Sequence, residues 1–131
     1  MARINGQEVN LLPTAGMKAE ATRYRAWKAD GRAGGTQVAA TRATQILSGN
    51  EMSRDTVITM AAWFARHEVD KQAEGFRPGE NGYPSPGRVA WAAWGGDPGQ
   101  TWANAKAETI RRLEAKATEE QSCKKVWRVL K

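Results

Sequence analysis

The side chains best suited to catalysis gather in one short stretch, residues 66–71 (RHEVDK). Its imidazole, carboxylates and cations could support general acid–base chemistry or metal-assisted hydrolysis. However, His67 is the only histidine and Cys123 the only cysteine, so the chain lacks a Cys/His set of the kind that holds zinc. Charged residues are also common at helix ends. We therefore expect no catalytic residues, no metal and no cofactor, and a metal-dependent hydrolase using His67, Glu68 and Asp70 is the least favoured alternative.

The basic residues suggest a second kind of chemistry, the binding of phosphate groups. The chain has 20 Lys and Arg against 14 Asp and Glu, a formal charge of +6, and this balance favours partners such as nucleic acid. Arg25, Lys28 and Arg32 have the i, i+3, i+7 spacing of one helix face, with Lys18 a turn or two earlier. The same spacing is typical of an ordinary solvated face. We predict nucleic-acid contacts from Lys18, Arg25, Lys28, Arg32, Arg42, Lys124, Lys125 and Arg128.

A third group of polar residues lies on the helix predicted over residues 54–68. Thr59, Trp63 and Arg66 form a stripe away from its predicted inward face, and Trp and Arg are enriched at protein interfaces. This stripe predicts a partner-binding surface. The alternative is that Trp63 packs beneath the long loop that follows.

A helix-turn-helix is another way in which the same segment could contact DNA. It would pair the helix predicted over residues 37–48 with that over 54–68, and would place Arg54, Asp55 and Thr56 where a recognition helix offers polar groups. The usual spacing of small residues and glycine at the turn is not met. A generic pair of packed helices is therefore the favoured interpretation.

These residues are positioned by helices that the capping residues and hydrophobic spacing predict. Asn5-Gly6 first suggests a tight N-terminal hairpin. Five helices are then expected, over residues 15–30, 37–48, 54–68, 88–94 and 98–121. For four of these helices the hydrophobic spacing also predicts which residues face inward. These residues are Met17, Ala21 and Tyr24 in the first helix; Ala39, Ala43, Ile46 and Leu47 in the second; Val57, Met60, Ala61 and Phe64 in the third; and Trp102, Thr109, Ile110, Leu113 and Ala117 in the last.

A glycine- and proline-rich loop feeds a tryptophan-rich segment in the middle of the chain. Residues 71–87 hold four glycines and three prolines, too many for regular structure, while Phe76 and Tyr83 indicate that the loop is packed. Trp91, Trp94 and Trp102 follow, and we expect all three to be buried in the core. A polar loop over an aromatic core is therefore predicted here.

Together these features predict a mainly α fold, a small single-domain bundle of about five helices with a long Gly/Pro-rich loop and a short N-terminal β-hairpin. The arm or hairpin would span residues 1–13, the helical core 14–121 and a basic tail 122–131, for which helix is favoured over an edge strand. No apolar run approaches the roughly 18 residues that would span a bilayer, and the start lacks the apolar core of a secretory signal. We expect a cytosolic protein that does not enter membranes.

Several segments resemble a small uncharacterised module of tailed-phage and prophage proteins. They are residues 31–36 (GRAGGT), 40–43 (ATRA), 64–71 (FARHEVDK), 75–80 (GFRPGE) and 84–102, with RVAW (88–91) and WGGDPG (94–99) as the most specific. The resemblance implies a phage origin and one shared fold. It brings no assigned activity, so no catalytic residue is carried over. The segments before Pro13 and after Gln121 lie outside it.

We therefore expect a phage-encoded small basic helical protein that binds nucleic acid non-specifically, or packs beside it in the virion. Its location would be the host cytoplasm or the virion. The main alternative is a virion-structural or anti-defence protein that binds a phage or host protein through Thr59, Trp63, Arg66 and the 71–87 loop. The two hypotheses differ in whether the cationic surface or the exposed aromatic side chains make the contact.

Overall fold

The chain begins with the short antiparallel hairpin that Asn5-Gly6 predicts. The computed structural model describes the backbone of residues 2–130 and the side chains of residues 2–118. Strand β1 (Ala2–Ile4) pairs with β2 (Gln7–Val9), and both turn residues are left-handed, with φ of 51° at Asn5 and 74° at Gly6. This conformation suits the tight turn of a two-residue hairpin. Ile4 is buried and β1 contacts the last helix, so the hairpin is packed against the helices.

The first three helices begin at the caps predicted from the sequence. A hydroxyl before each helix accepts a hydrogen bond from a backbone N–H in the first turn. All predicted inward residues of these helices are buried except Leu47, which is half-buried. The helices and their capping residues are α1 (Ala15–Ala29, Thr14), α2 (Gln37–Ser48, Thr36) and α3 (Arg54–His67, Ser53).

The elements after α3 differ in their boundaries from the prediction. A 3-10 helix, η1 (Glu68–Gln72), continues directly from α3 and takes up the start of the predicted loop. Helix α4 (Pro86–Ala93) begins at Pro86 rather than at Arg88, because Ser85 caps it and proline is well tolerated in a first turn.

The last helix is longer than predicted at both ends. Helix α5 (Gly96–Leu130) begins at Gly96, so Asp97 lies in its first turn and does not cap it. It also continues through Gln121, the predicted end. The helical tail favoured over a strand is therefore confirmed for the backbone, as a continuation of the same helix.

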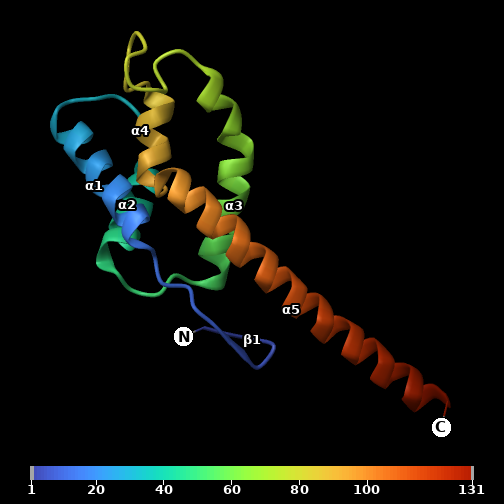
Figure 1. Cartoon of the computed structure of the whole chain (residues 1–131). Helices are drawn as coiled ribbons and strands as arrows, with labels where there is room; N and C mark the ends of the chain where they lie inside the picture. Colours follow the sequence, from blue (N-terminus) through green and yellow to red (C-terminus); the bar gives the residue numbers. More distant parts are fainter. Residues whose placement is uncertain (1, 131) are drawn as a thin grey trace.

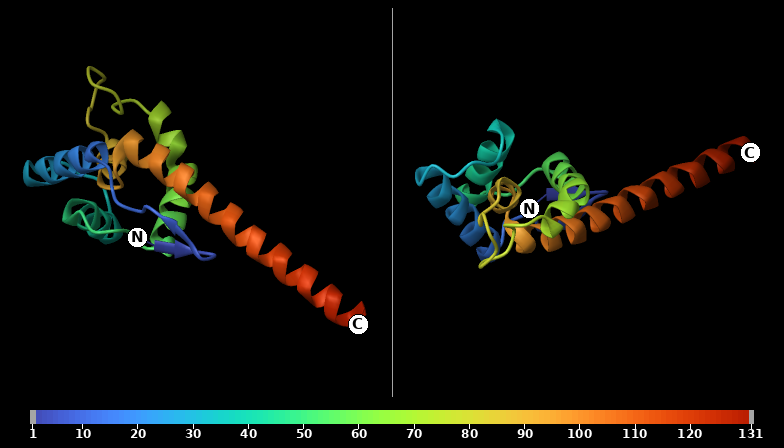
Figure 2. Two further views of the ribbon diagram at one scale, coloured as in Figure 1. Left: turned by 60° about the horizontal axis from the view of Figure 1, so that its bottom comes forward. Right: turned by 90° about the horizontal axis from the view of Figure 1, so that it is seen from above.

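Helix α4 lies in the middle of the fold (Figure 1). It packs against α1 and α2 on one side and against η1 and the start of α5 on the other, while α3 packs along α5. Figure 2 shows that the C-terminal part of α5 projects beyond all other elements in both views. Five α-helices, one 3-10 helix and a hairpin make up the described part, which confirms the mainly α class.

The tryptophan-rich segment forms the core, as predicted. Trp91, Trp94 and Trp102 are 1%, 3% and 7% exposed. Trp91 packs edge-on against Phe64 of α3 and Phe76 of the loop, with ring centroids 4.8 and 5.9 Å apart. The loop is thus anchored to the core through Phe76, and the indicated packing of the loop is confirmed.

Candidate functional site

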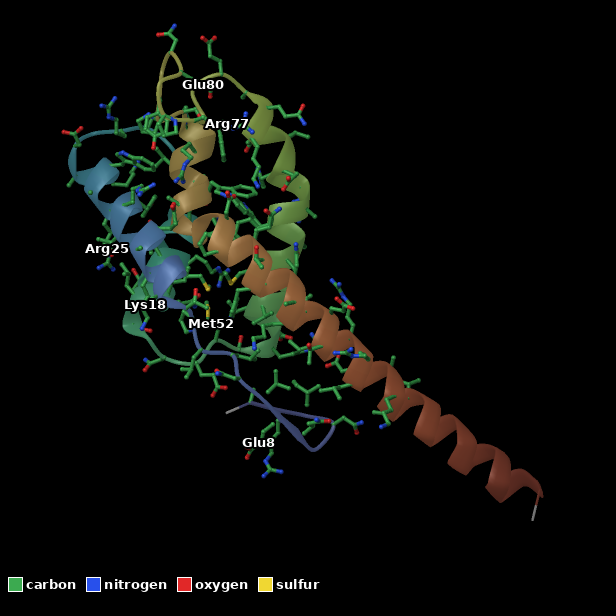
Figure 3. The ribbon with its side chains drawn as sticks, viewed as in Figure 1. Glu8, Lys18, Arg25, Met52, Arg77 and Glu80 are labelled. Carbon is green, nitrogen blue, oxygen red and sulfur yellow. The ribbon has the colours of Figure 1, made fainter. Side chains whose placement is uncertain are left out.

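Lys18 and Arg25 project from the same side of α1, where it meets α2 (Figure 3). Arg25 Nη2 donates a hydrogen bond to Thr44 Oγ1 of α2 at 3.2 Å. The Lys18 ammonium lies beside Gly49, where α2 ends. Arg25 is exposed and Lys18 half-buried, so both cations remain accessible at the junction of the two helices.

Lys28 and Arg32 do not continue this row in the way that the spacing predicts. Helix α1 ends at Ala29, so Arg32 lies in the following turn, where it forms an ion pair with Asp30 at 3.5 Å. Lys28 Nζ donates to the carbonyl oxygens of Arg32 and Gly34, each at 3.1 Å. Both side chains are exposed, but part of their hydrogen-bonding capacity is used to close the end of α1.

The acidic residue of α1, Glu20, is withdrawn from the cationic side. Its side chain is 15% exposed and both carboxylate oxygens accept hydrogen bonds from Arg88 Nη2, at 2.9 and 3.2 Å. A carboxylate that is buried and paired offsets little of the positive potential at the surface. The accessible side of α1 is therefore more cationic than its sequence composition suggests.

The remaining residues predicted to contact nucleic acid, Arg42 and those of the basic tail, differ from the α1 residues. The Arg42 guanidinium lies 4.8 Å from the centre of the Trp94 ring, Nη1 donates to Gln45 Oε1 at 2.7 Å, and burial lowers the pKa of Arg42. Arg42 is thus held at the edge of the core by a cation–π contact. The side chains of Lys124, Lys125 and Arg128 lie outside the described residues, so their predicted contacts stay predictions.

Trp63 does not form the exposed stripe that its spacing suggests. It is 8% exposed and stacks between His67 and Trp94, with ring centroids 4.4 and 4.6 Å away. His67 belongs to α3 and Trp94 is the residue that caps the end of α4, so Trp63 is also not simply covered by the long loop. The helical spacing alone places Trp63 away from the core, because the spacing does not reveal that Trp91 and Trp94 cover a second side of α3. Thr59 and Arg66 are exposed.

The two helices proposed for a helix-turn-helix do not serve as such a pair. Helix α2 packs against α1 and α4, whereas α3 packs along α5. Arg54, at the start of the supposed recognition helix, donates to both carboxylate oxygens of Glu114 on α5, at 2.9 and 2.7 Å. This pairing raises the pKa of Arg54 and lowers that of Glu114. Arg54 thus links α3 to α5 and is not free to contact bases.

Of the three residues of the catalytic alternative, the structure brings His67 and Asp70 together and places Glu68 in a different contact. His67 Nδ1 lies 3.3 Å from Asp70 Oδ2 while its ring stacks on Trp63. Glu68 instead accepts a hydrogen bond from Gln100. Among the described residues, no group of three or more His, Cys, Asp or Glu side chains is arranged to hold a metal ion.

A polar network in the interior was not anticipated from the sequence. Its centre is Arg88, which is 9% exposed and whose guanidinium lies 5.1 Å from the Trp27 ring centre and 5.7 Å from that of Phe76. Its counter-ion is Glu20 of α1. A charge at this depth is costly unless it is paired, which explains why Glu20 turns inward.

The network reaches the surface at Asp97 in the first turn of α5, whose side chain is 72% exposed. Lys71 Nζ lies 3.0 Å from Asp97 Oδ1 and 4.8 Å from the centre of the Trp91 ring, and Trp91 Nε1 donates to the same carboxylate at 3.0 Å. Partial burial alone would raise the pKa of Asp97, but the hydrogen bonds from Lys71 and Trp91 outweigh it and hold the pKa below its ordinary value.

The network joins distant parts of the chain. Helix α1 contributes Glu20, while η1, the loop, α4 and α5 contribute Lys71, Phe76, Arg88, Trp91 and Asp97. The available signal in the sequence was an arginine inside the otherwise apolar segment 88–94. That signal pointed to a buried charge but did not reveal its partner.

Comparisons with protein-family models, with curated proteins and with solved structures found no match. Within the described part of the chain, no helix has the length and apolar character needed to cross a membrane. A functional assignment therefore depends on the residues and contacts described above.

Replacing Asp97 with asparagine should make the stability of the protein less sensitive to acid. Because the pKa of Asp97 is depressed in the folded state, its stabilising contribution is fully present above the ordinary value of about 4 and is lost as the pH falls through the folded pKa. The melting temperature of Asp97→Asn, followed by circular dichroism between about pH 6 and pH 3, should fall less than that of the wild type. If the melting temperatures of the two proteins fell in parallel with pH, this would contradict a depressed pKa of Asp97.

Proposed function

We propose that this chain is a phage-encoded small basic protein that binds nucleic acid non-specifically or packs beside it in the virion. The observation that carries the proposal is the separation of charge on α1. Lys18 and Arg25 lie on its accessible side, while the acidic Glu20 is turned inward and paired with Arg88. Cations arranged in this way bind phosphate groups irrespective of base sequence.

Two regions would contribute to the contact. The first is the α1 surface with Lys18, Arg25, Lys28 and Arg32. The second is the C-terminal end of the chain, where residues 122–131 (SCKKVWRVLK) include four basic residues and no acidic one. The resemblance to a module of phage proteins supports the phage origin, and with it a location in the host cytoplasm or the virion.

Removing two charges from the α1 surface should weaken binding to DNA more than removing two elsewhere. For Lys18→Gln/Arg25→Gln, loss of two phosphate contacts predicts binding roughly 10- to 60-fold weaker at about 0.1 M salt, and a log–log salt slope smaller by about 1.8. The assay is fluorescence anisotropy with a labelled duplex over a salt series.

The matched control is Arg66→Gln/Arg77→Gln, which removes the same charge from exposed positions on α3 and on the loop. Figure 3 shows Arg77 at the end of the molecule away from Lys18. This control should lose much less affinity. Equal losses in the two double variants would mean that net charge, and not the α1 surface, governs binding, and would overturn the assignment of the contact.

The protein-partner alternative has less support, because Trp63, its proposed anchor, is buried. Thr59 and Arg66 remain accessible, but alone they form a small polar surface. Failure of the wild type to bind duplex DNA at low salt, together with nuclease-insensitive co-purification of a phage or host protein, would favour this alternative and end the nucleic-acid proposal.

A further inference from the structure

A small cavity lies within the interior polar network, between α1, α4, the first turn of α5 and the loop. It has a volume of about 60 Å³ and is lined by Glu20, Phe76, Arg88, Trp91 and Asp97. A cavity of this size has room for a group of a few non-hydrogen atoms. The Asp97 side chain is 72% exposed, so the cavity has a route to solvent at its rim.

Arg88, which lines this cavity, has an unused donor. Its Nη2 binds Glu20, whereas Nη1 is buried and has no hydrogen-bond partner among the described residues. Nearly all buried polar groups in folded proteins are paired, because an unpaired one costs the full loss of its hydration. A ligand that offers a hydrogen-bond acceptor to Arg88 would remove this cost.

The other lining residues limit the charge that such a ligand can carry. The charged groups that line the cavity are already paired, Arg88 with Glu20 and Asp97 with Lys71, so an anion or a cation placed there would have no counter-ion of its own. A cation would also leave the Arg88 donor without an acceptor. A neutral group with both an acceptor and donors satisfies both demands, and the rings of Phe76 and Trp91 favour a flat one.

We propose that this cavity binds a primary carboxamide. Its carbonyl oxygen would accept a hydrogen bond from Arg88 Nη1, and its NH₂ group would donate to the carboxylate of Asp97 or Glu20. The group could belong to a small free amide or to an Asn or Gln side chain of a partner protein. The cavity shares Glu20 with α1 but is not lined by Lys18, Arg25, Lys28 or Arg32, so amide binding and nucleic-acid binding can be tested apart.

The test is a titration of the wild-type protein with acetamide, followed by NMR at the Trp91 indole N–H, which donates to Asp97 at the cavity. We expect a saturable shift of this signal in the millimolar range, since a ligand of so few atoms binds weakly. Acetate and methylammonium, which have similar size but carry a charge, should cause no saturable shift at the same concentrations. Equal responses to all three probes, or no saturation with acetamide, would overturn the proposal.

Two further experiments locate the binding site and identify the molecule that supplies the carboxamide. Asp97→Asn should weaken acetamide binding about tenfold, whereas Asp55→Asn, the same change at an 86% exposed carboxylate, should leave it unchanged. Equal losses in these variants would also overturn the proposal. A capped Gly-Gln-Gly peptide that binds like acetamide, while Gly-Glu-Gly does not, identifies a protein side chain as the occupant; binding of acetamide alone identifies a free amide.

Discussion

Replacing Trp91 with alanine should lower the free energy of unfolding by about 3–5 kcal/mol, a large share of the roughly 5–15 kcal/mol that stabilises a typical domain. Trp91 is 1% exposed and its ring contacts Phe64, Phe76 and Trp63 with centroids 4.8, 5.9 and 5.9 Å apart. The truncation would leave a large cavity and would also remove the hydrogen bond from Trp91 Nε1 to Asp97. Urea denaturation followed by circular dichroism measures the effect.

Two comparison variants make this prediction specific to Trp91. Trp91→Phe keeps most of the buried ring but loses the indole N–H, and should cost clearly less than the alanine variant. Leu12→Ala changes a side chain that is 46% exposed, and should shift the free energy of unfolding by less than about 0.5 kcal/mol. A Trp91→Ala protein as stable as Leu12→Ala would show that the aromatic cluster is not the core of the fold.

Breaking the ion pair between Glu20 and Arg88 should have the second largest effect. The two side chains are 15% and 10% exposed, so neither charge is well screened by solvent. Glu20→Met leaves a buried guanidinium without its counter-ion and should cost about 3–5 kcal/mol of stability. Thermal or urea unfolding of the purified variant tests this directly.

The double variant Glu20→Met/Arg88→Met separates the cost of an unpaired charge from the value of the pair. Replacing both members of a buried pair by apolar side chains of similar volume is often nearly neutral. The double variant should therefore recover most of the stability that Glu20→Met loses. A double variant at least as unstable as Glu20→Met alone would show that the pair itself, and not the avoidance of a lone charge, stabilises the fold.

The features that the sequence predicts well are those decided by neighbouring residues. Thr14, Thr36 and Ser53 each precede an apolar stripe and each caps a helix, because capping depends on a hydroxyl and the next few backbone N–H groups. Asn5-Gly6 likewise determines the hairpin through its backbone preference alone. Local chemistry was sufficient for both.

The features that the sequence does not reveal depend on residues far apart in the chain. Glu20 and Arg88 are separated by 68 positions, and nothing local to Glu20 indicates that it turns inward. The single obvious apolar stripe of α3 predicts an exposed Trp63, whereas Trp94 of the α4–α5 junction covers that side of the helix. Pairing across the fold decides both positions, and it cannot be derived from spacing within one helix.

The salt dependence of DNA binding by the unmodified protein tests the proposed function most directly. With about three or four phosphate contacts from the α1 surface, the affinity for a duplex should fall by about 40- to 150-fold between about 50 and 200 mM salt. Two duplexes of unrelated sequence should give the same curve. An affinity that does not change with salt, or no binding at about 50 mM salt, would contradict the account.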